Sequence, residues 1–349
     1  MNIDPSLFSA PVTPQERAAF TQQFYPQHRT AKPTVVAGLW VAGVAIVVLF
    51  GSAFLPSIVL GLIIPAIIVL SATAILVLFR IFFEIDFNIR TETSIKAYRF
   101  ASAHKLDFLP EIQNPRRSGF IFSTPNAKTP VIRDSITNTG EYPFEIGNYH
   151  YIIGSGRSQT ERKIGFMRIT LDKNLPHMVL DTTADDTKFF GIRQSNLGMS
   201  FTKDQAMRLE GNFNDYFTLY APKEYETDAL YVFTPDLMAR LIDNSHAFNA
   251  EIVDDSLYIY STDYMHLDRP ETYEKLFGIY NTVGSKALKQ TQSYRDTRSE
   301  TRGEVATQGR RLNRRATVAV GSLVLVVYLV YTMPVIGQSI EQLLNKIFW

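Results

Sequence analysis

Cysteine is absent from the 349-residue chain, and this absence excludes several kinds of chemistry at once. The protein has no disulfide framework, no thiolate nucleophile and no Cys-based zinc or iron–sulfur site. An excess of charge is lacking as well, because 35 Lys and Arg residues face 34 Asp and Glu residues, for a formal net charge of +1. A nucleic-acid partner is therefore not expected, since binding to phosphates needs a concentrated basic face.

Common catalytic motifs are also missing. No G-x-S-x-G serine motif and no H-E-x-x-H metal motif occurs in the sequence. The stretch GSGR at 154–157 is not a phosphate-binding loop, because neither the Lys-Ser/Thr pair of a P-loop nor the third glycine of a dinucleotide fingerprint follows it. Its glycines instead predict a hairpin turn.

Charged residues are missing from two neighbouring apolar stretches, residues 35–54 and 58–79. About 20 apolar residues at 1.5 Å per residue cross the roughly 30 Å hydrocarbon core of a bilayer, and the short link between these stretches predicts a helical hairpin. Small residues such as Gly38 would let its two helices pack closely. A third apolar run, 316–333, precedes Pro334, so we expect three transmembrane helices.

Basic residues lie at the ends of these runs in a pattern that sets their orientation. They occur before the first run, after the second and before the third, whereas the hairpin link has none. Because positively charged flanks stay in the cytoplasm, we predict a multi-pass protein of the plasma membrane with a cytoplasmic N-terminus and main domain. The last basic cluster should attract anionic lipid headgroups, at about 1 kcal/mol per residue, through Arg310, Arg311, Arg314 and Arg315.

These patterns predict an α+β fold, in which a cytoplasmic domain based on antiparallel sheet is attached to an N-terminal membrane hairpin and one C-terminal membrane helix. The expected segments are a cytoplasmic N-terminal arm with a short helix (1–33), the hairpin (34–83), and a helical extension with a loop-rich connector (84–143). They are followed by the soluble domain (144–290), a basic tether (291–315), the third membrane helix (316–333) and a short external tail (334–349).

Helix signals flank the membrane hairpin on both sides. Thr13, Pro14 and Glu16 have the pattern of a capping box at the start of a short helix. That helix either lies on the membrane surface through its phenylalanines or forms a solvated arm. Residues 85–109 have helical spacing, so we expect the second membrane helix to continue into the cytoplasm and to end at Pro110.

From residue 144 onwards the sequence has short β-rich runs closed by turn residues, as in an antiparallel sheet. We expect strands at 144–153, 165–171, 178–182, 207–210, 217–220, 229–233, 250–253 and 257–261. The Asp-Asp-Ser sequence at 254–256 should form a hairpin turn between the last two. Helices are expected to start at Thr234 and near Pro270.

Tyrosines alternate along two of the expected strands, at Tyr149, Tyr151, Tyr258 and Tyr260. One face of each strand is therefore aromatic. This pattern fits either core packing or a face that binds a peptide or ligand.

Two histidines, His150 and His177, lie in strand-like surroundings, and Asp181 follows the second closely. A histidine beside carboxylates can bind a metal or act in acid–base catalysis, but no metal-site spacing is present, hydrogen-bonded or solvated polar residues are the favoured explanation, and we assign no metal site and no cofactor. Arg157 lies at the predicted turn. Convergence of His150, His177 and Arg157 on one pocket would favour an enzyme, and their separation would disfavour it.

Several stretches carry a resemblance to known proteins: FEIGNYHYIIGSGR (144–157), LPHMVLD (175–181), LEGNFNDYFTLYAPKEYETDALYVFTPDLM (209–238), EIVDDSLYIYS (251–261) and, more weakly, YRFASAHKLDFLP (98–110). They resemble a family of uncharacterised bacterial membrane proteins, found in actinobacteria and candidate-phylum bacteria, that share a domain of unknown function. The resemblance implies a common fold and membrane attachment, and it supplies no catalytic residues. Arg157 matches a basic residue that follows the GSG turn in the family.

A domain held at the membrane without a recognisable catalytic set suggests an interaction or scaffold module. Such a module would meet a protein partner at the inner face of the membrane, with an envelope complex as one setting. Two alternatives stay open. One is a membrane-bound, metal-dependent hydrolase that uses His177 with Asp181, and the other is a pore or transport subunit. The absence of charged residues inside the spans disfavours the latter, unless several copies line a channel.

Overall fold

The computed structural model describes residues 3–28, 36, 38–44, 46–47, 59–140, 142–182, 187–189, 192–194, 201–209, 212–235, 239, 248–261, 264–281, 294–301 and 303–314. The predicted third membrane helix and external tail lie outside these residues, as does most of the helix expected from Thr234.

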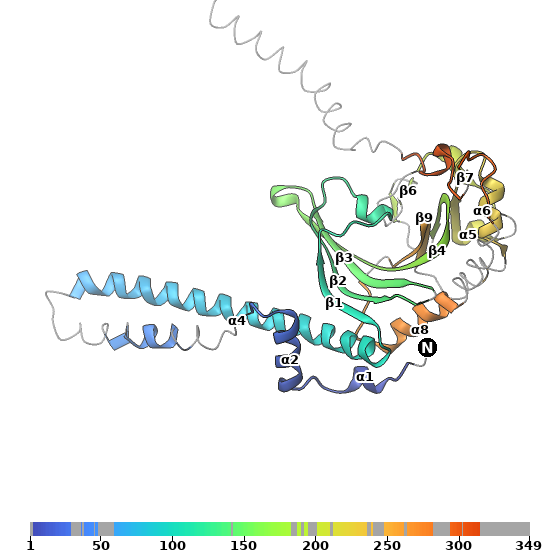
Figure 1. Cartoon of the computed structure of the whole chain (residues 1–349). Coiled ribbons are helices and arrows are strands. Elements are labelled where there is room, and N and C mark those ends of the chain that lie inside the picture. Colours follow the sequence, from blue (N-terminus) through green and yellow to red (C-terminus); the bar gives the residue numbers. More distant parts are fainter. Residues whose placement is uncertain are drawn as a thin grey trace, which may run out of the picture.

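An antiparallel sheet of seven strands forms the centre of the domain (Figure 1). The strands follow the order β1-β2-β3-β4-β8-β7, with β9 paired to β4. Their bounds are β1 Asp107–Gln113, β2 Lys128–Asn138, β3 Phe144–Ile153, β4 Thr160–Thr182, β7 Ala206–Met207, β8 Phe217–Tyr220 and β9 Phe248–Ser261. Two short strands, β5 Thr187–Phe189 and β6 Ile192–Gln194, pair separately. The predicted α+β class based on antiparallel sheet is confirmed.

The long strand β4 organises this sheet. β3 pairs with its first half, β8 pairs with its last residues, and β9 pairs with both halves. Because Val179 pairs with both Tyr220 and Glu251, β8 and β9 lie on opposite sides of β4. The turn between β3 and β4 is the predicted hairpin. Gly154 there has φ +88°, and a Cβ at this position would lie 2.4 Å from the carbonyl oxygen of Ser158.

Three predicted details of the sheet are wrong. The strands expected at 165–171 and 178–182 form one continuous strand, β4. Residues 254–256 do not form a hairpin turn, because β9 continues through them; Asp254 has φ 53°, and the register shifts there because the facing strand β4 bulges with extra residues. A bulge places one extra residue in a strand, and Asp tolerates the left-handed conformation better than most residues. Residues 229–233 belong largely to a helix, α6 (Glu226–Val232), rather than to a strand.

The two faces of the sheet pack against different elements. One face meets α1 (Ser6–Ser9), the last turns of α4 (Val59–Ala103) and α8 (Pro270–Ile279), and together they form the larger hydrophobic core. The other face is covered by the short 3₁₀ helix η1 (Phe120–Ser123), which packs on the four alternating tyrosines. Those tyrosines are buried, so core packing explains their pattern. The remaining short helices are α5 (Phe213–Tyr216), η2 (Gly156–Ser158), η3 (Lys203–Gln205) and η5 (Thr307–Gly309).

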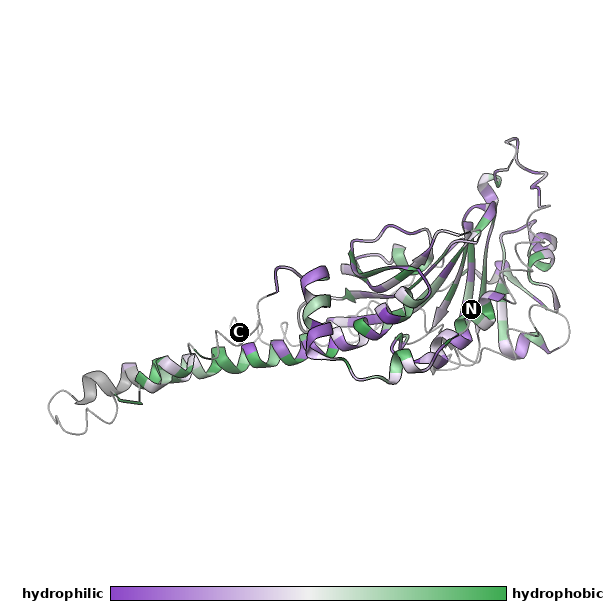
Figure 2. Cartoon of the chain, turned by 60° about the horizontal axis from the view of Figure 1, so that its bottom comes forward, coloured by the Kyte–Doolittle hydropathy of each residue, from purple (hydrophilic) through white to green (hydrophobic). Residues whose placement is uncertain are grey.

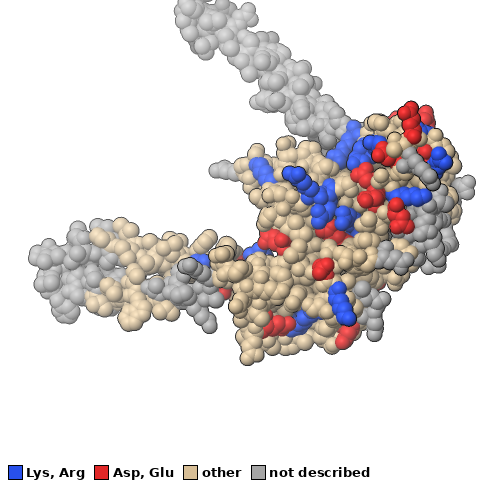
Figure 3. Space-filling model, in the orientation of Figure 1, with Lys and Arg blue, Asp and Glu red and all other residues tan. Residues whose placement is uncertain are grey.

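Helix α4 has two halves in different surroundings. At 1.5 Å per residue its 45 residues extend about 67 Å, and its N-terminal half projects from the domain as an apolar rod with few charged atoms (Figures 2 and 3). Within the described residues it is the one helix long and apolar enough to cross a membrane, and none of its most apolar stretch is buried. Its C-terminal half packs on the sheet through Ile95, Phe100 and Ala101.

The predicted continuation of the second apolar run into a long helix is therefore confirmed. The helix ends at Ala103 rather than at Pro110, which lies within the edge strand β1. An edge strand accommodates proline because its outer side makes no ladder hydrogen bonds. Helical residues between 36 and 47 lie beside α4, where Gly38 is so close to Val77 that a Cβ would lie 2.3 Å from its side chain.

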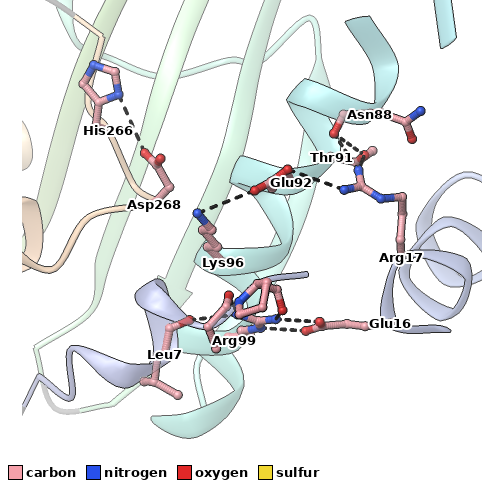
Figure 4. Close-up of polar contacts among 12 residues, drawn as sticks. Leu7, Glu16, Arg17, Asn88, Thr91, Glu92, Lys96, Arg99, His266 and Asp268 are labelled. Atoms are coloured by element: carbon pink, nitrogen blue, oxygen red, sulfur yellow. Dashed lines mark hydrogen bonds and ion pairs between the residues drawn. The ribbon is translucent and has the colours of Figure 1, made fainter. Parts of the chain in front are cut away.

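The N-terminal arm is docked on the domain rather than forming a free solvated arm, and its phenylalanines pack on the domain. Helix α2 (Pro14–Phe24), capped by Thr13 as predicted, buries Phe20 against Tyr98 and Phe108. Arg99 of α4 fastens the arm (Figure 4). Its guanidinium donates two hydrogen bonds to the carboxylate of Glu16, at 2.7 and 2.6 Å, and others to backbone carbonyls of the arm.

The described part of the basic tether is also docked on the domain. Tyr225 donates a hydrogen bond to Asp296 at 2.7 Å, and the guanidinium of Arg298 lies 4.2 Å from the centre of the Tyr225 ring. Arg298 forms ion pairs with both Asp296 and Asp228. Residues 294–314 thus follow the surface of the domain rather than forming a free linker.

Arg99→Lys should loosen the N-terminal arm without unfolding the sheet. Lysine cannot reproduce the bidentate contact with Glu16, so the local opening free energy should fall by about 1.4 kcal/mol, equivalent to an open state about tenfold more populated and amide exchange about tenfold faster. Hydrogen exchange of residues 3–24 in the full chain measures this. The matched control is Lys96→Arg, whose partner Glu92 is half exposed at 3.7 Å. Unchanged protection of the arm in Arg99→Lys would contradict the assigned role of Arg99.

Candidate functional site

A cavity of about 930 Å³ lies where α4 passes from its exposed half to its buried half. This volume is within the usual range for sites that bind small molecules, about 300–1,000 Å³. Three parts of the chain form its walls: the segment 24–28 that follows α2, residues 83–94 of α4, and a polar wall from strands β1 to β4 with the loop at 264–266.

The first two walls mix apolar and polar side chains. The apolar residues are Phe83, Phe87 and Ile89 from α4 and Phe24 and Tyr25 from the N-terminal segment, and the polar ones from α4 are Asp86, Arg90, Thr91, Thr93 and Ser94. Ile89 is 65% exposed and Phe83 is 49% exposed, so both also belong to the exposed apolar surface of the projecting half of α4. The apolar side of the cavity is therefore continuous with the surface of the projecting helix.

The polar wall contains His150, which is buried without a hydrogen-bond partner. Only 4% of the residue is exposed, and neither ring nitrogen makes a hydrogen bond. The nearest carboxylate oxygen, on Glu161, lies 3.6 Å from Nδ1, which is too long for a hydrogen bond. Burial, together with the charges of Arg133 and Lys163, lowers the pKa of His150 to about 4. The ring is thus neutral at pH 7 and offers one donor and one acceptor.

Asp134 is the second buried polar group of this wall. It occupies a bulge of β2 with φ 53°, and its Oδ1 accepts a hydrogen bond from the Ser94 hydroxyl of α4 at 2.5 Å. Burial raises the pKa of Asp134 to about 6, against the opposing effects of Ser94, Arg133 and Tyr264. A carboxylate kept buried in a cavity at a cost in stability is a feature of functional sites.

The sequence-predicted site residues do not converge on this cavity. His150 lines it, whereas His177 lies on the opposite face of the sheet. Arg157 belongs to η2 in the turn between β3 and β4. Asp181 is buried near the end of β4, opposite Thr218 of β8. This separation disfavours an active site built from these four residues.

Both ring nitrogens of His177 already have partners within the protein. The backbone N–H of Leu312 donates to Nδ1 at 2.9 Å, so the proton lies on Nε2, which donates to Glu251 at 2.8 Å. Glu251 also accepts hydrogen bonds from the Tyr260 hydroxyl and the Phe120 backbone. His177 therefore joins β4 and β9 to the C-terminal segment and has no free nitrogen for a metal. No cluster of three or more metal-ligating side chains occurs within the described residues.

The arginines expected to contact lipid headgroups have partners in the domain. Arg310 pairs with Glu304 at 2.8 Å, Arg311 forms two contacts with Asp254, and Arg314 donates to Ser123. Arg315 lies outside the described residues. The segment that carries them lies on the far side of the sheet from the projecting half of α4 (Figure 1). Contact between these arginines and lipid stays a prediction.

Sequence reasoning did not find Asp134, Arg133 and Glu251. A signal was present for the first two, since a charged Arg-Asp pair interrupts the β-branched stretch VIRDSIT. Nothing in the sequence indicated that Glu251 would meet His177, because strands distant in the chain bring them together.

No family model matches the chain, and no curated protein matches it. Among solved structures, the chain is similar to the crystal structure of the mycobacterial trehalose monomycolate transport factor A, TtfA. The TM-score is 0.33 with 8% sequence identity, over 57% of this chain and 91% of that chain. A similarity this weak carries no argument about fold or function, and the family resemblance seen in the sequence stays a prediction.

His177→Phe should destabilise the fold and release the C-terminal segment. The substitution leaves the Leu312 N–H without its partner and removes one donor from the buried carboxylate of Glu251, at a cost of about 2–4 kcal/mol. Thermal unfolding and the rate of tryptic cleavage after Arg310 and Arg311 measure the two effects. The control is His266→Phe, which changes a half-exposed histidine. A stoichiometric metal that is lost in His177→Phe, with stability unchanged, would instead support the metal-dependent enzyme.

Asp134→Asn should stabilise the protein at pH 7 but not at pH 4. The folded-state pKa of Asp134, about 6, lies above the ordinary value of 3.8. Protonated Asp134 therefore makes its full contribution to the free energy of unfolding below pH 4, and this contribution is lost as the pH rises through 6. The charged form costs about 3 kcal/mol at pH 7, and asparagine avoids that cost while still accepting from Ser94.

The measurement is the unfolding free energy of the full chain at both pH values. Asp107→Asn, at an exposed position of β1, is the control and should change neither value. An equal gain at pH 4 and pH 7 would contradict the raised pKa of Asp134.

Proposed function

We propose that this protein is a membrane-anchored interaction module whose domain is held close to the bilayer surface. The continuity of α4 is the observation that carries this proposal. An unburied apolar half of a helix has no favourable place in water, and a length of about 20 apolar residues suits a bilayer. The buried half of the same helix belongs to the core of the domain, so the anchor and the domain move as one body.

Two further observations support the anchor. The helical residues around Gly38 pack closely on α4, as in a membrane hairpin with small residues at the contact. The basic residues that flank the hairpin favour a cytoplasmic domain by the positive-inside rule. A three-span topology and a protein partner in an envelope complex are part of the proposal.

The metal-dependent hydrolase and the pore gain no support from the described residues. His177 is occupied by Glu251 and Leu312, and α4 carries no charged residue between 59 and 79 that could serve an ion pathway. The interaction module is therefore the function that the arrangement supports best.

Alkaline carbonate should leave the protein in the membrane pellet, and charges on the projecting half of α4 should release it. Leu76→Arg with Phe79→Arg adds two arginines within the span, each at about 2.5–3.5 kcal/mol. Leu230→Arg with Tyr231→Arg is the matched control, since these residues are exposed apolar side chains of the domain. A wild-type protein that washes off with carbonate would refute the anchor.

The interaction itself is tested by cross-linking in intact membranes followed by gentle solubilisation. The same protein partner should be recovered in independent preparations, and its recovery should fall when the anchor is disrupted. A monomer free of partners in every preparation would refute an interaction module.

A further inference from the structure

The position of the cavity gives it access to a membrane lipid. Residues 83–94 of α4 form one wall, and these residues directly follow the unburied apolar half of the helix. If that half crosses the bilayer, the apolar wall begins at the level of the lipid headgroups. Phe83 and Ile89 are exposed there, so an acyl chain could pass from the bilayer along α4 without crossing water.

The polar end of the cavity has hydrogen-bonding capacity that the protein does not use. His150 is more than nine-tenths buried and both of its ring nitrogens lack partners. The Nε of Arg133, on the neighbouring strand, is also buried without a partner. Such groups are rare in folded proteins because each costs about 1–3 kcal/mol. A bound polar group would satisfy them.

The charges around the cavity are nearly balanced. Its cationic residues are Arg90, Arg133 and Lys163, and its anionic residues are Asp86, Glu111, Asp134 and Glu161. Four of these residues form ion pairs with one another, Arg90 with Asp86 at 3.0 Å and Lys163 with Glu161 at 3.2 Å. A strongly anionic headgroup would meet the remaining carboxylates, whereas a headgroup with both charges matches Arg133 on one side and Asp134 on the other.

We propose that this cavity binds one membrane lipid with a zwitterionic headgroup, which lies against His150, Arg133 and Asp134, while an acyl chain follows Phe83 and Phe87, which share one face of α4. A phosphate would accept hydrogen bonds from Arg133 and from the protonated nitrogen of His150. An ammonium group would donate to Asp134. This inference rests on the proposed membrane anchor, and it adds the class of ligand that the cavity next to the anchor binds.

The experiment uses the full chain in nanodiscs of equal parts phosphatidylethanolamine and phosphatidylglycerol. After transfer to mild detergent, native mass spectrometry counts and identifies the lipids that each protein molecule retains. The wild type should keep one phosphatidylethanolamine. Thr93→Trp, which fills the cavity from α4, and His150→Leu, which removes the unpartnered ring, should each lower the occupancy about tenfold.

The controls separate binding from folding and from anchoring. Thr227→Trp places the same bulk on an exposed helical position of α6 and should leave occupancy unchanged. Thermal unfolding of each variant identifies any that fails to fold, and His150→Leu is not expected to fail, because it removes a buried polar group without a partner. Carbonate extraction of the same preparations reports the anchor independently.

Equal lipid retention in wild type, Thr93→Trp and His150→Leu would overturn the proposal while leaving the anchor intact. Preferential retention of phosphatidylglycerol in the cavity would overturn the assigned headgroup. Loss of the protein from carbonate-washed membranes would instead refute the proposed function, on which the lipid site depends.

Discussion

The structure depends on one helix, α4, whose two halves suit different surroundings, an apolar medium and the core of the domain. Between Ile67 and Phe83, α4 presents exposed isoleucine, leucine and phenylalanine side chains, and none of its most apolar stretch is buried within the described chain. The second half is amphipathic and buries one face, through Ile95 and Phe100, in the core of the sheet domain. Because backbone hydrogen bonds run without interruption between the halves, a rotation of the anchor is transmitted to the domain. The same continuity fixes the position of the cavity, whose α4 wall lies at the change of environment.

Contacts distant in sequence prevent the domain from separating from this helix. Arg99 ties the N-terminal arm to α4, and Arg17 donates to the Asn88 carbonyl about three turns closer to the projecting half. The arm in turn supplies a cavity wall just before the chain enters the first apolar run. The domain thus surrounds the base of α4 from two directions, which limits the orientations in which a ligand or partner could approach.

The buried polar groups of the protein fall into two kinds. Glu251 and Glu145 each accept hydrogen bonds from several donors, and such satisfied carboxylates make the fold specific. His150 has no partner, and Asp134 is held in a bulge with a raised pKa. The two groups of the second kind both face the cavity. The unpartnered ring nitrogens of His150 and the unpartnered Nε of Arg133 therefore lie together at one wall of the cavity.

The sequence by itself determined the features that depend on local pattern. Periodicity and capping predicted α2, α8 and the continuation of α4 beyond its apolar run, and alternation predicted β3 and β8 with their bounds. The sequence also indicated an apolar segment fit for a membrane. It misassigned residues 229–233, because a short apolar run suits a helix or a strand equally, and residues 254–256, because their polar sequence resembles a turn although β9 continues through them. Tertiary structure alone decided that His150 and His177 lie on opposite faces, that Glu251 meets His177, and that Asp134 is buried beside Ser94. The physical reason is that these contacts join segments between 40 and 135 residues apart in the chain, and strand register, which local sequence does not encode, sets which side chains meet.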